Sequence, residues 1–417
     1  MTFTLSPPAQ LPQAPADLLD ADFYGFQQRL TDTEQRALRD IREFLETEVR
    51  PHADDQWERA ESPRHLIPRI AELGLYGNAF PETARYENSS VFRGWVALEI
   101  SRVDPSTATF IGVHSGLAMT SIWVGGSDDQ KAEWLPTLAA GKLIGAFGLT
   151  EPGHGSDTAK GLETTAERRG DHWVLNGAKR WIGNGAFADV VVIWARDVAD
   201  DQVKGFLVRT PAPGFTATKI QRKQSLRAVE NADIVLRDVV VPERDRLQRI
   251  DGFRDVAVVL RLTRADVAWQ ALGVAVGAYE CALAYAKNRV QFGRPIASFQ
   301  LVQEKLSTAL SNITASIALC MRVSEMQDEG MQRDHHSAMA KAFVTARMRE
   351  TVALCREICG GNGIQLGGAS QLPGDIPPGH SIARYFADAE AVYTFEGTYD
   401  MNSLIVGRAI TGIPAFV

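Results

Sequence analysis

The sequence lacks the patterns that mark several large classes of protein. Its 417 residues contain only four cysteines, without CxxC or Cys/His ligand spacing, which argues against a disulfide framework or a structural metal site. The formal net charge is −7 and both signs are interspersed, so no basic stripe is available to bind nucleic acid. The cysteines, all in the C-terminal third, are expected to be buried, reduced thiols: Cys281, Cys320, Cys355 and Cys359.

Signals for targeting and membrane insertion are also missing. Residues 1–22 contain no basic residue and no long apolar core, and residues 414–417 do not form a peroxisomal address. No apolar run approaches the roughly 20 residues that a membrane-spanning helix needs. We therefore expect a cytoplasmic protein without membrane insertion. Internal repeats and the GxGxxG and Walker motifs of nucleotide-binding loops are absent as well.

The first regular segment of the chain reads as a helix. Thr31 and Glu34 have the spacing of a capping box, and the apolar residues that follow recur at helical spacing. Pro51 is expected to end this helix, because a proline in a helix interior removes a hydrogen bond. Further helical stretches follow to about Leu138.

The hydrophobic period then changes to that of strands. Between residues 143 and 241, five short stretches rich in β-branched and aromatic residues predict a β domain. Asn176-Gly177, inside the second stretch, predicts a hairpin turn. From about Phe253 the chain returns to long helical segments. The predicted units are an N-terminal arm (1–28), an N-terminal helical domain (29–142), a central β domain (143–248) and a C-terminal helical bundle (249–417).

One glutamate near the C-terminus is a candidate catalytic base. Glu396 lies between Phe395 and Gly397, after one predicted helix and before another. A poorly solvated pocket would raise the pKa of this carboxylate and suit it to removing a weakly acidic proton from carbon. The alternative is a structural role, in which Thr398 or the glutamate itself caps the next helix.

Six ordered blocks of the sequence resemble the acyl-CoA dehydrogenase and acyl-CoA oxidase superfamily. Within it, the motifs are most similar to glutaryl-CoA dehydrogenases and short-chain acyl-CoA oxidases. The similarity extends over nearly the whole chain. The blocks are LTDTEQRALRDIREFLETEVRP from Leu30, GAFGLTEPGHGSD from Gly145, KRWIGNGAFAD from Lys179, RVQFG from Arg289, GGNGI from Gly360 and YTFEGTYDMNSLIVGRAITGIPAF from Tyr393.

The resemblance implies a fold, a cofactor and a reaction. The fold is α+β but mainly α, with an N-terminal helical domain, a central β-barrel-like domain and a C-terminal four-helix bundle. FAD binds between the last two, and a neighbouring subunit completes its site, so the family is at least dimeric and usually tetrameric. An acyl-CoA is oxidised to trans-2-enoyl-CoA, and the electrons pass to an electron-transfer flavoprotein in a dehydrogenase or to O2 in an oxidase.

The same resemblance implies roles for individual residues. Glu396 matches the family's base, and its backbone N–H acts with a flavin ribityl hydroxyl on the thioester oxygen. Arg289 suits the FAD pyrophosphate because a guanidinium is bidentate and permanently charged; outside the resemblance it would read as a surface arginine, and Trp181 as core. The implied substrate-binding residues are Ser156, Arg264 and Gly397. The implied cofactor-binding residues are Phe147, Leu149, Thr150, Gly155, Ser156, Trp181, Ile182, Gly183, Arg289, Phe292, Gln300, Gly360, Gly361, Thr398 and Asp400.

Two departures from the family pattern bear on function. Gly183 stands where many dehydrogenases have a threonine whose hydroxyl approaches the flavin, whereas short-chain oxidases also read WIGN. Ala108 stands where glutaryl-CoA dehydrogenases hold the distal carboxylate with an arginine, and Ser101 and Gly112 occupy the supporting positions. Glutaryl-CoA is therefore not expected as substrate, because its carboxylate would lack a partner. A short and uncharged, or a branched, acyl chain is expected instead.

Three functions remain open from the sequence. The first is an FAD-dependent acyl-CoA dehydrogenase, and the second is a short-chain acyl-CoA oxidase, against which the missing peroxisomal address counts. The third is a non-redox or monooxygenase homologue on the same fold, which the presence of Glu396 disfavours. A Gly/Pro-rich stretch, residues 365–380, is longer than the family's usual connection and predicts a lid, a contact between subunits or a plain surface insertion.

Overall fold

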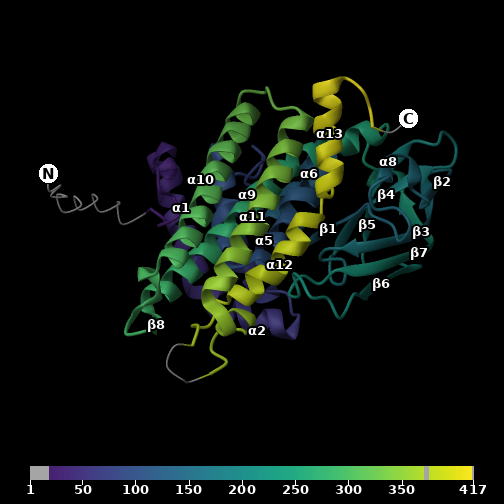
Figure 1. Ribbon diagram of the computed structural model, residues 1–417. Coiled ribbons are helices and arrows are strands. Elements are labelled where there is room, and N and C mark those ends of the chain that lie inside the picture. The colour runs from purple at the N-terminus through teal and green to yellow at the C-terminus, as the bar shows by residue number, and fades with distance from the viewer. Residues whose placement is uncertain (1–17, 371–374, 416–417) are drawn as a thin grey trace.

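A computed structural model describes residues 18–370 and 375–415, and the chain runs from helices to a sheet and back to helices (Figure 1). This order confirms the expected mainly α architecture with a central sheet. The helices before the sheet are α1 (Asp32–Phe44), α2 (Arg50–Arg59), α3 (Ile67–Glu72), α4 (Ser90–Val103), α5 (Pro105–Ile111), α6 (Thr120–Gly125) and α7 (Asp128–Ala139).

The sheet has seven strands in the order β1-β4-β2-β3-β7-β6, with β5 paired to β4. Five strands lie in the five predicted stretches, whereas β2 and β6 were not predicted. The bounds are β1 (Gly145–Gly148), β2 (Thr165–Arg169), β3 (His172–Ile182), β4 (Val190–Asp197), β5 (Val203–Arg209), β6 (Phe215–Lys219) and β7 (Ala232–Pro242), with the short helix α8 (Thr158–Gly161) between β1 and β2.

The C-terminal part consists of long helices beside the sheet (Figure 1). Helices α9, α10, α11 and α12 contact one another as a bundle, and α13 packs on α11. The elements are α9 (Phe253–Asn288), the hairpin β8 (Val290–Gln291) and β9 (Arg294–Pro295), α10 (Gln300–Asp328), α11 (Asp334–Cys359), α12 (Ile382–Thr394) and α13 (Tyr399–Thr411). The cysteines are buried and free, as predicted.

Two helices of this bundle, α9 and α10, are long and apolar enough to cross a membrane by length and composition alone. This finding corrects the expectation that no apolar run approaches the required length. Burial in the protein core explains the apolar composition of α9, because 83% of its most apolar window lies inside the protein. For α10 the buried share is 39%. The core helix of a bundle passes the same test, so the two helices are weak evidence for a membrane span.

The first helix begins as predicted but does not end where expected. The N–H of Glu34 donates to Oγ1 of Thr31 (3.3 Å) and the N–H of Thr31 donates to Oε2 of Glu34 (3.0 Å), which completes the capping box. Pro51 does not end the helical segment. A π-helical turn, η2 (Leu45–Val49), lies between α1 and α2. Pro51 then lies in the first turn of α2, where its missing N–H has no intrahelical role.

The predicted hairpin at Asn176-Gly177 is also wrong. Strand β3 continues through both residues, and its register against β7 shifts between Leu175 and Gly177. Gly177 has φ 150°, and a Cβ there would lie 2.5 Å from Oγ1 of Thr164. The glycine therefore marks a bulge at which two backbones approach closely.

Helices α4 and α9 approach each other over glycines on both sides. A Cβ on Gly273 would lie 2.3 Å from the carbonyl oxygen of Leu98, and a Cβ on Gly277 would lie 2.3 Å from that of Arg102. On α4, a Cβ on Gly94 would lie 2.2 Å from the indole of Trp269. The absence of side chains at these positions sets the distance between the two helices.

The described ends of the 365–380 stretch are fixed to the N-terminal helices. The N–H of Gly379 donates to Oδ2 of Asp54 on α2 (2.7 Å), and the N–H of Gly367 donates to Oγ of Ser381 (2.6 Å). Residues 371–374 lie outside the described residues. The lid and subunit-contact predictions stay predictions.

A fully buried guanidinium joins α12 to the N-terminal helices. Nε of Arg384 donates to Oδ1 of Asp54 (3.0 Å), its Nη1 donates to Oδ1 of Asp104 (2.7 Å), and its Nη2 donates to the carbonyl of Val103 (3.0 Å). The neighbouring carboxylates raise the pKa of Arg384, against the effect of burial.

Replacing Arg384 with methionine is expected to destabilise the protein by about 3–5 kcal/mol, because two buried carboxylates would lose their counter-charge. Denaturant unfolding of the two proteins measures this difference. Arg59→Met, at an exposed arginine of α2, is the control and is expected to change stability by no more than about 0.5 kcal/mol. A similar small change for both variants would contradict the structural role of Arg384.

Candidate active site

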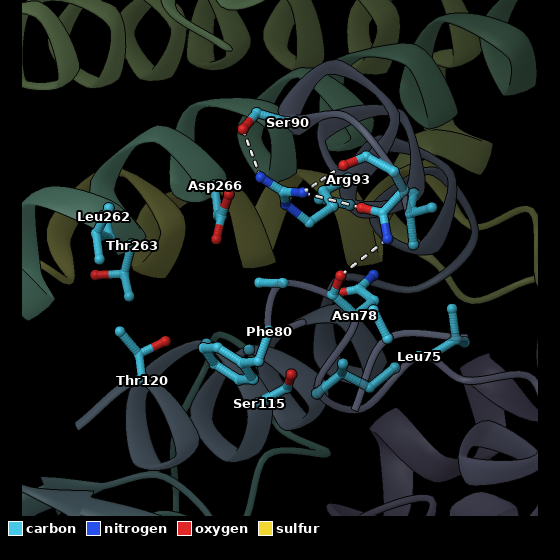
Figure 2. A pocket seen from close by; sticks show the side chains of 18 of the residues that line it. Leu75, Asn78, Phe80, Ser90, Arg93, Ser115, Thr120, Leu262, Thr263 and Asp266 are labelled. Carbon is cyan, nitrogen blue, oxygen red and sulfur yellow. Dashed lines mark hydrogen bonds between the residues drawn. The ribbon is translucent and has the colours of Figure 1, made fainter. Parts of the chain in front are cut away.

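A cavity of about 800 Å³ lies between α4, α5 and α9, and the π-helical segment η4 (Gly112–Met119) and residues 75–88 form much of the remaining wall (Figure 2). A volume of this size is in the range of pockets that enclose whole small ligands. Helix α9 presents Thr263, Asp266 and Gln270 to it, because side chains three and four residues apart share one face. Ala108 and Gly112, identified from the sequence, also line it.

Glu396 lies in the turn between α12 and α13, in a left-handed conformation with φ 52°. Residues other than glycine seldom adopt this conformation, and they do so most often at functional sites. Oε2 of Glu396 accepts a hydrogen bond of 2.6 Å from Oγ1 of Thr263, which lines the cavity. The carboxylate is therefore bonded to a side chain of the cavity wall. Its own backbone N–H donates no hydrogen bond within residues 18–370 and 375–415.

Two basic side chains flank this turn. Nζ of Lys341, a fully buried residue of α11, donates to the carbonyl oxygens of Tyr393 (3.3 Å) and Gly397, on the two sides of Glu396. Arg264 lies on α9, and its Nε is buried with no hydrogen-bond partner in the described chain. A buried donor without a partner is costly, so Nε of Arg264 is available to bind a ligand.

Burial shifts the pKa of four ionisable groups near Thr263 towards neutrality. It raises the pKa of Glu396, against the hydrogen bond from Thr263 and the charges of Lys341 and Arg264. It lowers the pKa of Lys341 to about 8 and also lowers that of Arg264. It raises the pKa of Asp266 to about 7. Shifted pKa values that gather in one cavity are typical of catalytic sites.

The residues after Glu396 begin a helix, as the alternative interpretation expects. Oγ1 of Thr398 accepts a hydrogen bond from the N–H of Met401 (3.2 Å) and caps α13. Asp400 is exposed in the first turn of this helix. The helix cap is thus Thr398 and not Glu396, whose carboxylate bonds to α9 instead.

A planar surface stands beside the cavity at the end of β3. Trp181 has φ 63° and is 51% exposed, whereas the next residue, Ile182, is buried. A Cβ built on Gly183 would lie 2.7 Å from Cγ2 of Val113, which belongs to η4. An exposed indole beside a glycine offers a flat, apolar contact to an aromatic ring system.

The other predicted residues near this surface differ in how far they are exposed. Phe147 and Leu149 are buried in the core. The carbonyl oxygen of Thr150 accepts a hydrogen bond from Arg180 (2.8 Å). Gly155 and Ser156 are exposed in the loop after β1.

Five predicted cofactor residues lie at the opposite end of the bundle, around the β8–β9 hairpin (Figure 1). Nδ2 of Asn362 donates to the hydroxyl of Tyr285 (3.4 Å), which brings the loop after α11 to the end of α9. Phe292 is 93% exposed there, with φ 52°. Within one chain these residues are not brought together with Glu396: Arg289, Phe292, Gln300, Gly360 and Gly361.

The sequence did not identify four residues that lie in or near the cavity. Thr263 and Asp266 flank Arg264, and the resemblance had already singled out this arginine. Lys341 is a single charge within an alanine-rich stretch of α11, which is a signal for a buried and partnered base. Arg93, on the cavity wall from α4, gave no sequence signal that separates it from a surface arginine.

Models of the acyl-CoA dehydrogenase family match almost the whole chain. The model of the N-terminal domain matches residues 31–142, that of the middle domain matches residues 146–239, and that of the C-terminal domain matches residues 251–411.

Two relatives named as acyl-CoA dehydrogenases are similar to this chain over most of its length. An acyl-CoA dehydrogenase of Bacillus subtilis is 32% identical over 377 residues, which are 89% of this chain and 96% of the relative. The mitochondrial short-chain specific acyl-CoA dehydrogenase of Rattus norvegicus is 32% identical over 382 residues, which are 90% of each chain.

Solved structures resemble the chain over its full length. The glutaryl-CoA dehydrogenase of Mycobacterium smegmatis superposes with a TM-score of 0.88 at 36% identity, over 96% of this chain and 100% of that chain. A glutaryl-CoA dehydrogenase of the same organism in complex with FADH2 also gives 0.88, at 34% identity over 94% and 98%. A chain from the structure of the electron transferring flavoprotein of Acidaminococcus fermentans gives 0.84, at 31% identity over 92% and 98%.

The contact between Gly183 and Val113 predicts the outcome of restoring a threonine. Gly183→Thr is expected to destabilise the protein by about 1–3 kcal/mol, because the new side chain overlaps Val113. Combined with Val113→Ala, the same substitution is expected to cost less than the sum of the single changes, which a double-mutant cycle of unfolding free energies measures. Additive effects would contradict a direct clash.

The raised pKa of Glu396 predicts that its removal stabilises the protein. At neutral pH the carboxylate is ionised in the unfolded chain without penalty, whereas in the folded protein burial disfavours its charge. Glu396→Gln is therefore expected to raise the free energy of unfolding. The gain should shrink as pH falls through the folded pKa, because the wild-type carboxyl then becomes neutral too. Thermal unfolding across pH tests this, with the exposed Glu82→Gln as a control that changes nothing.

Proposed function

The chain belongs to the acyl-CoA dehydrogenase family of oxidoreductases, and we propose that it is an FAD-dependent enzyme that oxidises an acyl-CoA thioester to trans-2-enoyl-CoA. The observation that carries the proposal is the desolvated Glu396, bonded to Thr263 on the wall of the cavity. A base of raised pKa suits removal of the weakly acidic proton next to a thioester carbonyl.

The residues present fit FAD. The exposed indole of Trp181 suits contact with an isoalloxazine ring, and the loop with Gly155 and Ser156 is exposed. The related glutaryl-CoA dehydrogenase was solved with FADH2. The chemistry that bound FAD supplies is acceptance of the hydride from the β-carbon.

Arg289 and the glycines Gly360 and Gly361 would hold the pyrophosphate and adenine. They lie far from Glu396 within one chain (Figure 1), which supports a homo-oligomer, such as the family's tetramer, in which one subunit completes the site of another. The proposed units of the chain are those drawn from the sequence, with boundaries at residues 28, 142 and 248.

The chain's own groups divide the remaining work. Oε of Glu396 takes the α-proton, and Thr263 holds the carboxylate towards the cavity. The backbone N–H of Glu396 has no partner in the described chain and can donate to the thioester oxygen as negative charge develops there. Lys341 fixes the turn by binding carbonyls on both sides of it. The unpaired Nε of Arg264 is available to the CoA arm.

Two features of the cavity bear on which acyl chain the substrate carries. Ala108 lines the cavity where an arginine would be needed to hold a glutaryl carboxylate, so we propose that glutaryl-CoA is not the substrate. Of the two classes expected, short and branched, the volume of about 800 Å³ favours the bulkier branched chain. The short-chain specific relative supports the other class.

For the electron acceptor we propose an electron-transfer flavoprotein in the cytoplasm. The dehydrogenase names of the relatives support it over an oxidase. Gly183, which the sequence shares with short-chain oxidases, has a local reason here, because Val113 occupies the space of a side chain. The glycine therefore no longer favours O2 as acceptor.

Anaerobic titration of the FAD-loaded protein with acyl-CoA thioesters tests the proposal. Bleaching of the flavin is expected, and Glu396→Gln should slow it by about a hundredfold to ten-thousandfold, since it removes the base. Glu390→Gln, at an exposed residue of α12, is the matched control and should bleach at the wild-type rate.

Admission of air then separates the two acceptors. Persistent bleaching supports a dehydrogenase, whereas rapid recolouring with release of peroxide would identify an oxidase. Absence of bleaching by short, branched and longer acyl-CoAs would refute the redox function.

A further inference from the structure

The wall of the cavity beyond Thr263 is polar, which a simple hydrocarbon chain does not require. Asp266 of α9 lies between Thr263 and Arg93 of α4 along one side of the cavity (Figure 2). Gln270, one turn further along α9, adds a third hydrogen-bonding side chain. Burying such groups beside a purely apolar ligand would be costly, because they would lose water and gain no partner.

Arg93 retains donors for a ligand. Its Nη1 donates to the carbonyl (3.1 Å) and to Oδ1 (2.9 Å) of Asn88, and its Nη2 donates to Oγ of Ser90 (2.5 Å), so three of its five N–H bonds are used. Asp328 is 4.0 Å away, beyond direct hydrogen bonding, and its carboxylate accepts from the N–H of Ser90. The guanidinium is therefore fixed in position with donors left over.

Asp266 supplies the complementary group. Its carboxyl makes no hydrogen bond to any residue that the structure describes, although it lines the cavity beside Arg93. Burial and the charge of Glu396 raise its pKa to about 7, against the charge of Arg93. Near neutral pH it therefore exists in both forms, and it can accept or donate a hydrogen bond.

On the basis of the proposed function, we infer that the acyl group of the substrate carries a neutral hydrogen-bonding group, such as a hydroxyl, that Arg93 and Asp266 bind on the cavity wall beyond Thr263. A hydroxyl satisfies both sides, since its oxygen accepts from Arg93 and its proton is donated to Asp266. A carboxylate fits poorly, because Asp266 and Asp328 already surround the single positive charge.

Matched thioesters test this inference. Hexanoyl-CoA, ω-hydroxyhexanoyl-CoA and adipyl-CoA have the same chain length and differ only at the end, as do octanoyl-CoA, ω-hydroxyoctanoyl-CoA and suberyl-CoA. The kcat/KM for flavin reduction is expected to be about tenfold higher for the hydroxyl member than for the alkyl member in at least one series, as one hydrogen bond to a charged group allows. Equal values, or preference for the alkyl or carboxylate member in both series, would overturn the inference.

Variants separate recognition from folding. Asp266→Leu and Arg93→Met are expected to abolish the preference for the hydroxyl member while the alkyl member still bleaches the flavin. Asp266→Asn keeps a neutral hydrogen-bonding group and is expected to retain the preference. A ratio that stays at the wild-type value in the leucine and methionine variants would show that these side chains are only structural, and would overturn the inference.

The same experiment distinguishes failure of the proposed function. Bleaching by any member of either series supports acyl-CoA oxidation, whatever the ratio between members. If no member bleaches the wild-type protein, the proposed function itself is refuted, and the inference falls with it.

Discussion

The close approach of α4 and α9 is the constraint on which the rest of the structure depends. Gly94, Gly273 and Gly277 leave no room for a side chain between the two helices, so their backbones nearly touch. On the N-terminal side of this contact the facing residues are larger, and the helices enclose the cavity instead of filling the space between them. One helix pair thereby supplies both a tight core contact and an open binding volume, and the transition between them occurs within a few turns of α9.

The buried charges of the protein fall into two kinds, and the difference is physical. Around Arg384, paired carboxylates raise the pKa of the guanidinium, so the charged form is stabilised in the fold. At the cavity, burial lowers the pKa of Lys341 and Arg264 and raises that of Glu396, so no charged group there is fully compensated. The first arrangement stabilises the folded state, whereas the second leaves charges whose proper partner is a ligand.

Local sequence patterns predicted the features that local physics decides. The capping box of Thr31 and Glu34 formed as expected, because its hydrogen bonds involve only neighbouring residues. Asn176-Gly177 predicted a turn but forms a bulge. Thr164, on another segment, packs against the glycine and occupies the position of a side chain there. Pairings between distant segments have no local signature.

Prediction of the candidate site was limited in the same way, to what residues close in the chain determine. Glu396 and Arg264 could be identified because their motifs are contiguous in the chain. The hydrogen bond from Thr263, the support from Lys341 and the position of Arg93 depend on how α4, α9 and α11 pack, which the residue pattern within each helix does not encode. The volume of the cavity is a property of that packing too, and a list of its lining residues does not provide it.

Helix α9 also couples two buried carboxyl groups electrostatically. Thr263, which holds Glu396, and Asp266, which lies beside Arg93, are three positions apart and lie on the same helix face. The charge of Glu396 raises the pKa of Asp266, and Arg93 opposes it. A change in the charge of Asp266 therefore alters the electrostatic environment of Glu396, since interacting acids share their titration. On the inferred binding of the acyl group, recognition by Asp266 and the readiness of Glu396 to accept a proton would thus depend on one set of buried charges.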